Sequence, residues 1–386
     1  MGVRITYNEA QLRESKEFNG PNGYRQCSVS LMDTIRTDLN FDEEGRSHHF
    51  HRYHDLKNNH IKEGELGKAA IRAAVKEMKI SGANKKYDCI LGVSGGVDST
   101  YLALVAKRLD LRVLCVHFDN GWNSELATEN IENIVSKCGF DLYTYVMDWE
   151  EFRAIQLAYF KSHVIDIEAV TDIAIFAALD KICRKFNMRH ILDGRNFKTE
   201  SVLGNWINKN PNNLLNIAEA QGAWPLNRFP IQSRWDLRTK GRNDHQKVNL
   251  PFLDWIDYEK SSAKQEITKE LGWRDYGGKH YESVFTRFYQ GYILPEKFKV
   301  DKRKAHLSNL IFCGQMSKED ALTEIAHPMY NQDLLKEDFQ FVRKKLGFSE
   351  TEFYAYIDEP EIPHEFYGET RSYGKDWRQF RLKHLV

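Results

Sequence analysis

The segment at residues 94–100 constrains what this chain can fold into more than any other. Its sequence is Ser-Gly-Gly-Val-Asp-Ser-Thr; a short apolar run at 87–93 precedes it, and a helical pattern continues to Leu109. A strand that turns through two glycines into a helix presents backbone N–H groups and the positive end of the helix dipole to an anion. Gly95 and Gly96 let the backbone approach that anion, because side chains would block it. The segment therefore predicts a phosphate-binding loop.

Apolar runs alternate with helical patterns around this loop. Strands are predicted at 87–93, 112–118, 142–147 and 190–193, and helices at 64–80, 99–107, 124–138 and 170–187. This alternation is typical of βαβ units, so the predicted fold class is α/β, a Rossmann-like parallel sheet with helices on both faces. Ligands of such sheets bind beyond the carboxyl ends of the strands, where the glycine loop is expected.

Three regions are predicted along the chain. Residues 1–80 are a small irregular segment ending in a helix, 81–300 form the nucleotide-binding domain, and 301–386 are mostly helical. Residues 205–250 lose the periodicity and gain Asn, Pro and Trp, which predicts a lid or a substrate loop. Further helices are predicted at 258–271, 318–324 and 333–345.

Composition narrows the classes of partner and compartment. The 55 basic and 55 acidic residues leave no net formal charge, which argues against a broad nucleic-acid surface. Six cysteines lie far apart with no CxxC pair, and Cys89 and Cys115 fall in predicted strands, so they are expected to be reduced core residues. Without an apolar leader or a run of 18 apolar residues, the protein is expected to be cytoplasmic and independent of membranes.

The glycine loop is not the Walker form, since no lysine precedes its hydroxyl residues. Ser-Gly-Gly-Val-Asp-Ser resembles the loop of the PP-loop ATPases, which split ATP into AMP and pyrophosphate and adenylate a substrate oxygen. The ATP-binding residues predicted here and at the end of the second strand are Ser94, Gly95, Gly96, Val97, Asp98, Ser99, Thr100, His117 and Asp119. Asp98 is also the predicted Mg²⁺ ligand. The side chains at 119–123 suit a glycine-containing turn equally well.

Polar clusters follow other predicted strands or open helices. Residues 166–172 hold three carboxylates, which either cap a helix or contact Mg²⁺ or a ribose. Residues 194–201 follow the fourth strand directly and favour binding of ATP or an acceptor. The basic run at 302–304 is either a solvated helix face or a stabiliser of departing pyrophosphate.

The sequence as a whole resembles the N-acetyl sugar amidotransferases of bacterial surface-polysaccharide and O-antigen synthesis. The resemblance runs from about Tyr24 to beyond Ala321. Its motifs are Phe-Asp-Glu-Glu-Gly at 41–45, the loop itself, Asp-Asn-Gly-Trp at 119–122, Asn196 with Thr-Glu-Ser at 199–201, the run at 272–283, and Asp-Lys-Arg-Lys-Ala-His-Leu-Ser at 301–308.

This resemblance implies that an acetamido group of a nucleotide-linked sugar becomes an acetamidino group in a lipopolysaccharide pathway. ATP with Mg²⁺ activates the amide oxygen, and ammonia displaces AMP. A separate glutaminase with a cyclase-like companion is the implied ammonia source, since Cys27 is too far from the start to be an N-terminal nucleophile. Asp98, Lys302 and Arg303 are the implied catalytic residues. The implied substrate residues are Asn196, Thr199, Glu200, His280, Glu282 and Arg287.

One departure from the family concerns zinc. Family members usually carry two short-spaced cysteine pairs near the N-terminus, which suit structural zinc. Here Cys27 remains, while Ser30, Ser47 and Phe50 occupy the other positions. Histidines crowd the same region, but loss of the zinc site is favoured over a rebuilt Cys/His site.

Two other functions remain open. A PP-loop enzyme that thiolates tRNA or forms lysidine would usually need clustered cysteines or a basic, aromatic-rich patch. A non-catalytic scaffold that keeps the nucleotide fold would account for the lost cysteine pairs. The sequence names neither the sugar, nor the modified position, nor the oligomeric state.

Overall fold

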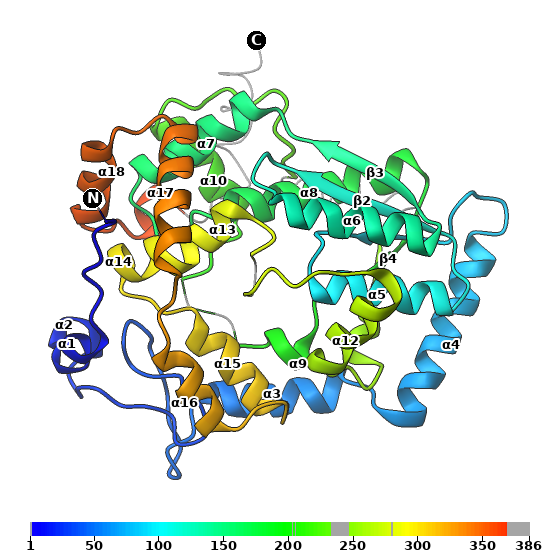
Figure 1. Cartoon of the computed structure of the whole chain (residues 1–386), viewed down its shortest axis with the longest axis horizontal. Coiled ribbons are helices and arrows are strands. Elements are labelled where there is room, and N and C mark those ends of the chain that lie inside the picture. The colour runs from blue at the N-terminus through cyan, green and yellow to red at the C-terminus, as the bar shows by residue number, and fades with distance from the viewer. Residues whose placement is uncertain (1, 203, 205, 233–246, 279–280, 369–386) are drawn as a thin grey trace.

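A five-stranded parallel sheet organises the middle of the chain in the computed structural model, which describes residues 2–202, 204, 206–232, 247–278 and 281–368. The strand order is β3-β2-β1-β4-β5 (Figure 1). The strands are β1 (Cys89–Gly92), β2 (Val113–Asp119), β3 (Asp141–Val146), β4 (His190–Leu192) and β5 (Val248–Leu250). All four neighbouring pairs are parallel, which confirms the predicted α/β class.

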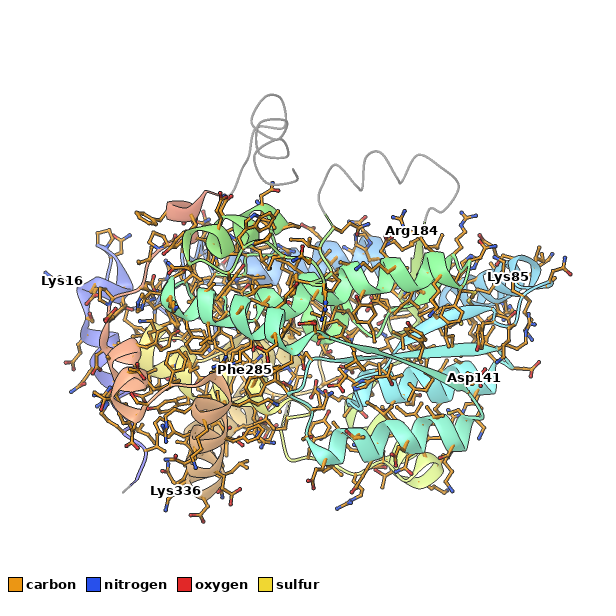
Figure 2. The ribbon with its side chains drawn as sticks, turned by 90° about the horizontal axis from the view of Figure 1, so that it is seen from above. Lys16, Lys85, Asp141, Arg184, Phe285 and Lys336 are labelled. Atoms are coloured by element: carbon orange, nitrogen blue, oxygen red, sulfur yellow. The ribbon has the colours of Figure 1, made fainter. Side chains whose placement is uncertain are left out.

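Helices cover both faces of this sheet, because its strands carry apolar side chains on both sides. One face packs on α4 (Gly64–Ser81), α5 (Val97–Arg108), α6 (Glu125–Cys138) and α12 (Lys260–Leu271). The other packs on α8 (Ala169–Lys185). Figure 2 shows the sheet between α8, which carries Arg184, and the helices below it. Cys89 and Cys115 are fully buried, as predicted.

The strand order creates a switch point beside β1. After β1 the chain moves outward to β2 and β3, and it then returns to β4 on the opposite side of β1. The connections therefore diverge at the carboxyl ends of β1 and β4. In open α/β sheets this crevice is where ligands bind. The glycine loop follows β1 directly and so lies at this position.

Several elements differ from the sequence prediction. The prediction missed α3 (His48–His60), α7 (Trp149–Lys161), α10 (Pro211–Ala220) and β5. Helix α10 lies within residues 205–250, which were predicted as one irregular excursion. Asn210 caps it by accepting a hydrogen bond from the Asn212 N–H (3.0 Å), and proline occupies its first turn. The polar residues that suggested a loop are thus helix-start signals, while residues 233–246 of the excursion lie outside the described residues.

As far as residue 368, where the described residues end, the C-terminal region is helical, as predicted. Its elements are α13 (Val284–Phe288), η2 (Tyr289–Ile293), α14 (Leu294–Phe298), α15 (Arg303–Phe312), α16 (Lys318–Ala326), α17 (Gln332–Leu346), α18 (Glu350–Asp358) and η3 (His364–Tyr367). Aromatic side chains from these helices form a second core with α7 and α8. The Arg287 guanidinium binds both carboxylate oxygens of Asp338 (2.5 and 2.7 Å) and joins α13 to α17.

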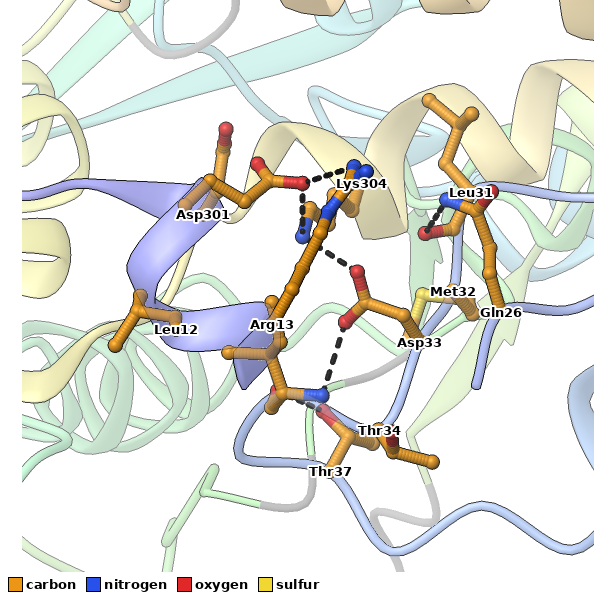
Figure 3. A network of polar contacts seen from close by, with 12 residues as sticks. Leu12, Arg13, Gln26, Leu31, Met32, Asp33, Thr34, Thr37, Asp301 and Lys304 are labelled. Carbon is orange, nitrogen blue, oxygen red and sulfur yellow. Dashed lines mark hydrogen bonds and ion pairs between the residues drawn. The ribbon is translucent and has the colours of Figure 1, made fainter. Parts of the chain in front are cut away.

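The N-terminal segment contains α1 (Glu9–Glu14) and α2 (Lys16–Asn19), and ion pairs bind it to α15. Lys304 of α15 contacts the buried Asp33 carboxylate (2.6 Å) and the Glu9 carboxylate (3.2 Å). Figure 3 shows this contact between Lys304 and Asp33. Burial raises the pKa of Asp33, and the Lys304 ammonium opposes that effect. The first and last predicted regions are therefore in direct contact.

Cys27, Ser30 and Ser47 form a small buried cluster of hydrogen-bonding groups. Cys27, Ser30 and Ser47 are all fully buried, and the Ser47 N–H donates to the Cys27 Sγ (3.2 Å). The Ser30 and Ser47 side chains also contact the Cys27 sulfur. One thiol and two hydroxyls are a poor donor set for structural zinc, which prefers Cys and His. Over the described ranges, no group of three or more potential metal ligands is found.

Within the described part of the chain, no helix combines the length and apolar character needed to cross a bilayer.

Candidate functional site

The loop after β1 has the geometry of an anion cradle. Gly95 adopts a left-handed backbone conformation (φ +79°), and Gly96 is the N-cap of α5 without a side-chain cap. The first N–H groups of a helix have no partner within it, so those of α5 face the loop. The Ser99 and Thr100 hydroxyls donate to the Gly96 carbonyl (3.2 and 2.7 Å). These contacts hold the turn that aims the amides outward.

Two other elements fix the shape of this loop. The Trp273 indole donates from Nε1 to the Gly95 carbonyl (2.9 Å), and the Asn130 amide of α6 donates to the same oxygen (3.4 Å). A Cβ at Gly95 would lie only 2.6 Å from the Ala127 carbonyl oxygen. Trp273, near the start of the motif at 272–283, therefore stabilises the backbone of the loop.

Further along, the same motif at 272–283 lies next to the glycines of the loop. A Cβ at Gly96 would lie 3.3 Å from the Tyr276 hydroxyl and 3.8 Å from the Glu282 carboxylate. The Tyr276 oxygen interacts with the Val97 backbone, and burial raises the pKa of Tyr276 well above its ordinary value. The Ser124 N–H donates to the Glu282 carbonyl (2.9 Å). Tyr276 and Glu282 therefore line the predicted phosphate site, whereas His280 lies outside the described residues.

Asp98 lies in the first turn of α5, where a carboxylate is favoured by the helix dipole. The Tyr258 hydroxyl donates a hydrogen bond to the Asp98 Oδ1. Tyr258 is buried, and both burial and the neighbouring carboxylate raise its pKa far above the ordinary value. The phenol therefore stays protonated and serves as a donor. Sequence reasoning missed Tyr258, because no spacing rule connects it to residue 98.

The segment after β4 lies against the loop. A Cβ at Gly194 would lie 3.7 Å from the Ser99 backbone. Asn196 caps the short helix α9 (Phe197–Glu200), accepting hydrogen bonds from the Thr199 N–H (2.8 Å) and from the Thr199 hydroxyl (3.0 Å). Thr199 is fully buried, and the Glu200 charge adds to the effect of burial and of Asp98 in raising the pKa of Tyr258. The structure thus brings the predicted residues 196–200 beside the loop.

Two buried polar atoms near α9 lack a hydrogen-bond partner among the described residues. Asp254 accepts a hydrogen bond from the Phe197 N–H (2.8 Å), and burial raises the pKa of Asp254 to about 6. Its other oxygen and the Asn196 Nδ2 have no hydrogen-bond partner among the described residues. Buried polar atoms in a cradle usually find a partner, so this position suits a water molecule or a ligand atom.

The turn after β2 is held by its own side chains. His117 contacts the Val93 carbonyl through Nδ1 (3.2 Å) and the Asn123 amide through Nε2 (3.0 Å). Asp119 accepts hydrogen bonds from the Gly121 N–H (2.9 Å) and from the Asn123 amide (3.2 Å). The predicted contact of His117 and Asp119 with ATP stays a prediction.

The predicted basic residues have other partners in this structure. Arg303 binds the buried Asp301 carboxylate (2.8 Å) and the carbonyls of His327 and Ile325 (2.8 and 3.2 Å). Lys302 lies 3.7 Å from the Glu168 carboxylate, which also accepts a hydrogen bond from the Gln290 amide (2.9 Å). Arg287 is paired with Asp338, as described above. The catalytic role of Lys302 and Arg303 and the substrate role of Arg287 stay predictions.

The cluster at 166–172 lies at the start of α8, where no side chain of the cluster caps the helix by a hydrogen bond, and it contains one buried acid. Asp166 accepts a hydrogen bond from the Asn208 N–H (2.8 Å), and burial raises the pKa of Asp166 to about 7. The negative charges of Asp172 and Glu168 raise it further, while Lys302 opposes them.

Replacing this acid is expected to change how stability depends on pH. Between about pH 4 and pH 7 the folded carboxyl binds a proton that the unfolded one has lost, so the free energy of unfolding falls as pH rises. Asp166→Asn keeps an oxygen for the Asn208 N–H and removes this loss. In thermal melts, the melting temperature of Asp166→Asn relative to that of the original protein should rise by a few degrees from pH 5 to pH 8. If the difference in melting temperature between the two proteins were the same at pH 5 and at pH 8, the raised pKa of Asp166 would be contradicted.

The loop residues fit Mg²⁺ and a triphosphate. The start of α5 supplies backbone N–H donors for phosphate, and the carboxylate in its first turn supplies an oxygen ligand for a hard cation. The glycines of the loop leave room for the anion, because a Cβ at either position would be crowded. Asp98 would hold the ion, which would offset phosphate charge when bound.

Comparison with known proteins gives one family match. Residues 282–382, about a quarter of the chain, match the family model described as LPS biosynthesis protein WbpG-like, C-terminal domain. The C-terminal region is therefore similar to that of WbpG-like LPS-biosynthesis proteins, in agreement with the predicted resemblance. Among curated proteins, none matches the sequence significantly.

Solved structures provide distant likenesses. The NMN synthetase from Francisella tularensis is 12% identical, with a TM-score of 0.36 over 73% of this chain and 97% of that one. The NH3-dependent NAD synthetase from Campylobacter jejuni is 13% identical, with a TM-score of 0.31 over 77% and 98%. The U34-tRNA thiolase NcsA from Methanococcus maripaludis is 10% identical, with a TM-score of 0.33 over 67% and 82%. TM-scores this low carry no functional conclusion for this chain.

Proposed function

We propose that this protein is an AMP-forming amidotransferase that converts an acetamido group of a nucleotide-linked sugar into an acetamidino group during lipopolysaccharide synthesis. The observation that supports it most is the Ser-Gly-Gly-Val-Asp-Ser loop at the β1/β4 switch point, in a chain whose C-terminal region matches a lipopolysaccharide-biosynthesis domain. Either feature alone fits many enzymes, whereas together they support ATP use on a sugar.

The chemistry explains why ATP is needed. An amide oxygen leaves poorly, so nitrogen cannot replace it directly. In the proposed reaction the amide oxygen forms a bond to the α-phosphorus of ATP, and pyrophosphate leaves. Ammonia then adds to the imidate carbon, AMP leaves with the former amide oxygen, and a proton is lost to solvent.

The loop residues have defined tasks in this proposal. The amides at 95–97 and the start of α5 bind the pyrophosphate portion, where fixed donors stabilise the charge that develops on departure. Asp98 holds Mg²⁺ on the phosphates. Asn196, Thr199 and Glu200, together with Glu282, would line the site toward the acceptor. Lys302 would need to leave Glu168 to reach the phosphates.

The ammonia source is proposed to be a second protein. A glutaminase with a cyclase-like companion would deliver ammonia without releasing it to water, where protonation destroys its nucleophilicity. In the absence of that partner, ammonium salt at alkaline pH should support turnover.

A nucleotide-product assay tests the proposal. The protein is incubated with ATP, Mg²⁺, ammonium salt and a panel of UDP-linked acetamido sugars, and the products are separated and weighed by mass spectrometry. The expected result is AMP with one sugar only, together with a product in which NH has replaced O. ADP in place of AMP would overturn the assignment of the loop, and AMP formation independent of every sugar would overturn the acceptor.

A further inference from the structure

Asp98 is held by a side chain from outside its own loop. The Tyr258 hydroxyl donates to its Oδ1, and Tyr258 comes from the turn that precedes α12. Figure 1 shows α12 lying beside α5. A carboxylate that receives a donor on one oxygen has its plane fixed, so the direction of its second oxygen is set as well. Metal ligands need this kind of support to keep their orientation.

Tyr258 is itself held in place on two sides. Its ring packs against the Tyr101 ring of α5, with centroids 5.6 Å apart. The Gln315 side chain donates from Nε2 to the Tyr258 carbonyl (3.1 Å) and accepts from the Lys260 N–H (3.1 Å). The Gln315 side-chain amide thus joins the backbone of Tyr258 to that of Lys260, on either side of residue 259.

Gln315 belongs to the C-terminal helical region. It follows α15, and its N–H donates to the Leu310 carbonyl (2.9 Å) at the end of that helix. It also lies within the segment that matches the lipopolysaccharide-biosynthesis domain. A continuous chain of contacts therefore leads from α15 through Gln315 and Tyr258 to Asp98.

We propose that Tyr258 is a positioning residue for the Asp98 carboxylate, and that Gln315 fixes Tyr258 for this task. The C-terminal helical region then helps to complete the cation site of the glycine loop. This inference rests on the proposed function for the roles of ATP and Mg²⁺. It assigns no contact with substrate to either residue.

The test measures Mg²⁺-dependent ATP binding without any acceptor. ATP is titrated calorimetrically at a series of Mg²⁺ concentrations, and the concentration that gives half-maximal tight binding is compared between proteins. Tyr258→Phe removes only the hydroxyl, and this midpoint should rise about tenfold, as expected for loss of a hydrogen bond to a charged group. Gln315→Ala should shift it in the same direction by a smaller factor. A general folding defect would lower the fraction of binding-competent protein and leave the midpoint unchanged.

Tyr87→Phe is the matched control. Tyr87, a largely buried residue, also donates through its hydroxyl to an aspartate, the Asp141 Oδ2 (2.8 Å), but at the amino ends of the strands. Its loss should leave the Mg²⁺ midpoint unchanged. An unshifted midpoint in folded Tyr258→Phe, or an equal shift in Tyr87→Phe, would overturn the inference.

Failure of the proposed function gives a different pattern. If no sugar is amidinated but the Mg²⁺ midpoint shifts in Tyr258→Phe and not in Tyr87→Phe, the positioning role stands and only the acceptor assignment falls. If the original protein does not bind ATP at any Mg²⁺ concentration, both fall.

Discussion

Asp98→Asn is expected to lower the rate of AMP formation at least about a hundredfold, the scale of a lost transition-state charge partner. The amide keeps the size of the side chain and an oxygen for the Tyr258 hydroxyl, so the local packing survives. It loses the negative charge that holds Mg²⁺ on the phosphates. The measurement is the initial rate of AMP release at saturating ATP, with ammonium and the acceptor sugar.

Thermal melting separates this effect from unfolding. Asp98 lies in the first turn of α5, where loss of a carboxylate costs about 0.3–1 kcal/mol. The melting temperature should therefore fall by only a few degrees. Raising the Mg²⁺ concentration should restore part of the rate. Normal turnover in Asp98→Asn would remove this residue from the mechanism.

Gly95→Ala is expected to abolish Mg²⁺-dependent ATP binding and to destabilise the fold. The left-handed backbone of Gly95 costs about 1–2 kcal/mol for a residue with a Cβ. The added Cβ also meets the Ala127 carbonyl at 2.6 Å, and backbone atoms cannot turn aside as a flexible side chain would. The loop cannot shift without breaking the Trp273 hydrogen bond to the Gly95 carbonyl. Calorimetric ATP titration and thermal melts measure both effects.

Two other glycines provide controls for this prediction. Gly139 after α6 shares the left-handed conformation (φ +70°), but a Cβ there meets nothing within 4 Å, so Gly139→Ala isolates the backbone strain. Gly92 at the end of β1 has open space and no positive φ, so Gly92→Ala should be nearly neutral for stability. A Gly95→Ala protein that binds ATP as tightly as these controls would refute the cradle geometry.

The sheet and the loop were predictable because their signals are local. Apolar runs of strand length and helical periods between them locate β1 to β4, and two glycines after an apolar run locate the turn. The positions of α7 and α10 were not predictable in the same way. Helix α10 opens with Asn210 and Pro211, residues that mark loops as often as helix starts.

The neighbours of the loop were harder to predict because they are far away in sequence. Tyr258 and Gln315 carry no motif, and only folding brings them to Asp98. The run at 272–283 was singled out by family resemblance, yet its task of supporting Gly95 through Trp273 became visible only in the structure. A charge run leaves the partners of its basic residues open for a related reason, since a buried acid such as Asp301 or Asp33 can engage a basic residue of such a run.

The central claim is that the amide oxygen of the acceptor is transferred to AMP. The most direct measurement uses the acceptor sugar labelled with ¹⁸O in its acetamido group, followed by mass spectrometry of the nucleotide released in the presence of ammonium. The account predicts one ¹⁸O in the phosphate of each AMP and an acetamidino sugar that has lost the label. Unlabelled AMP beside a sugar that keeps its ¹⁸O would contradict it.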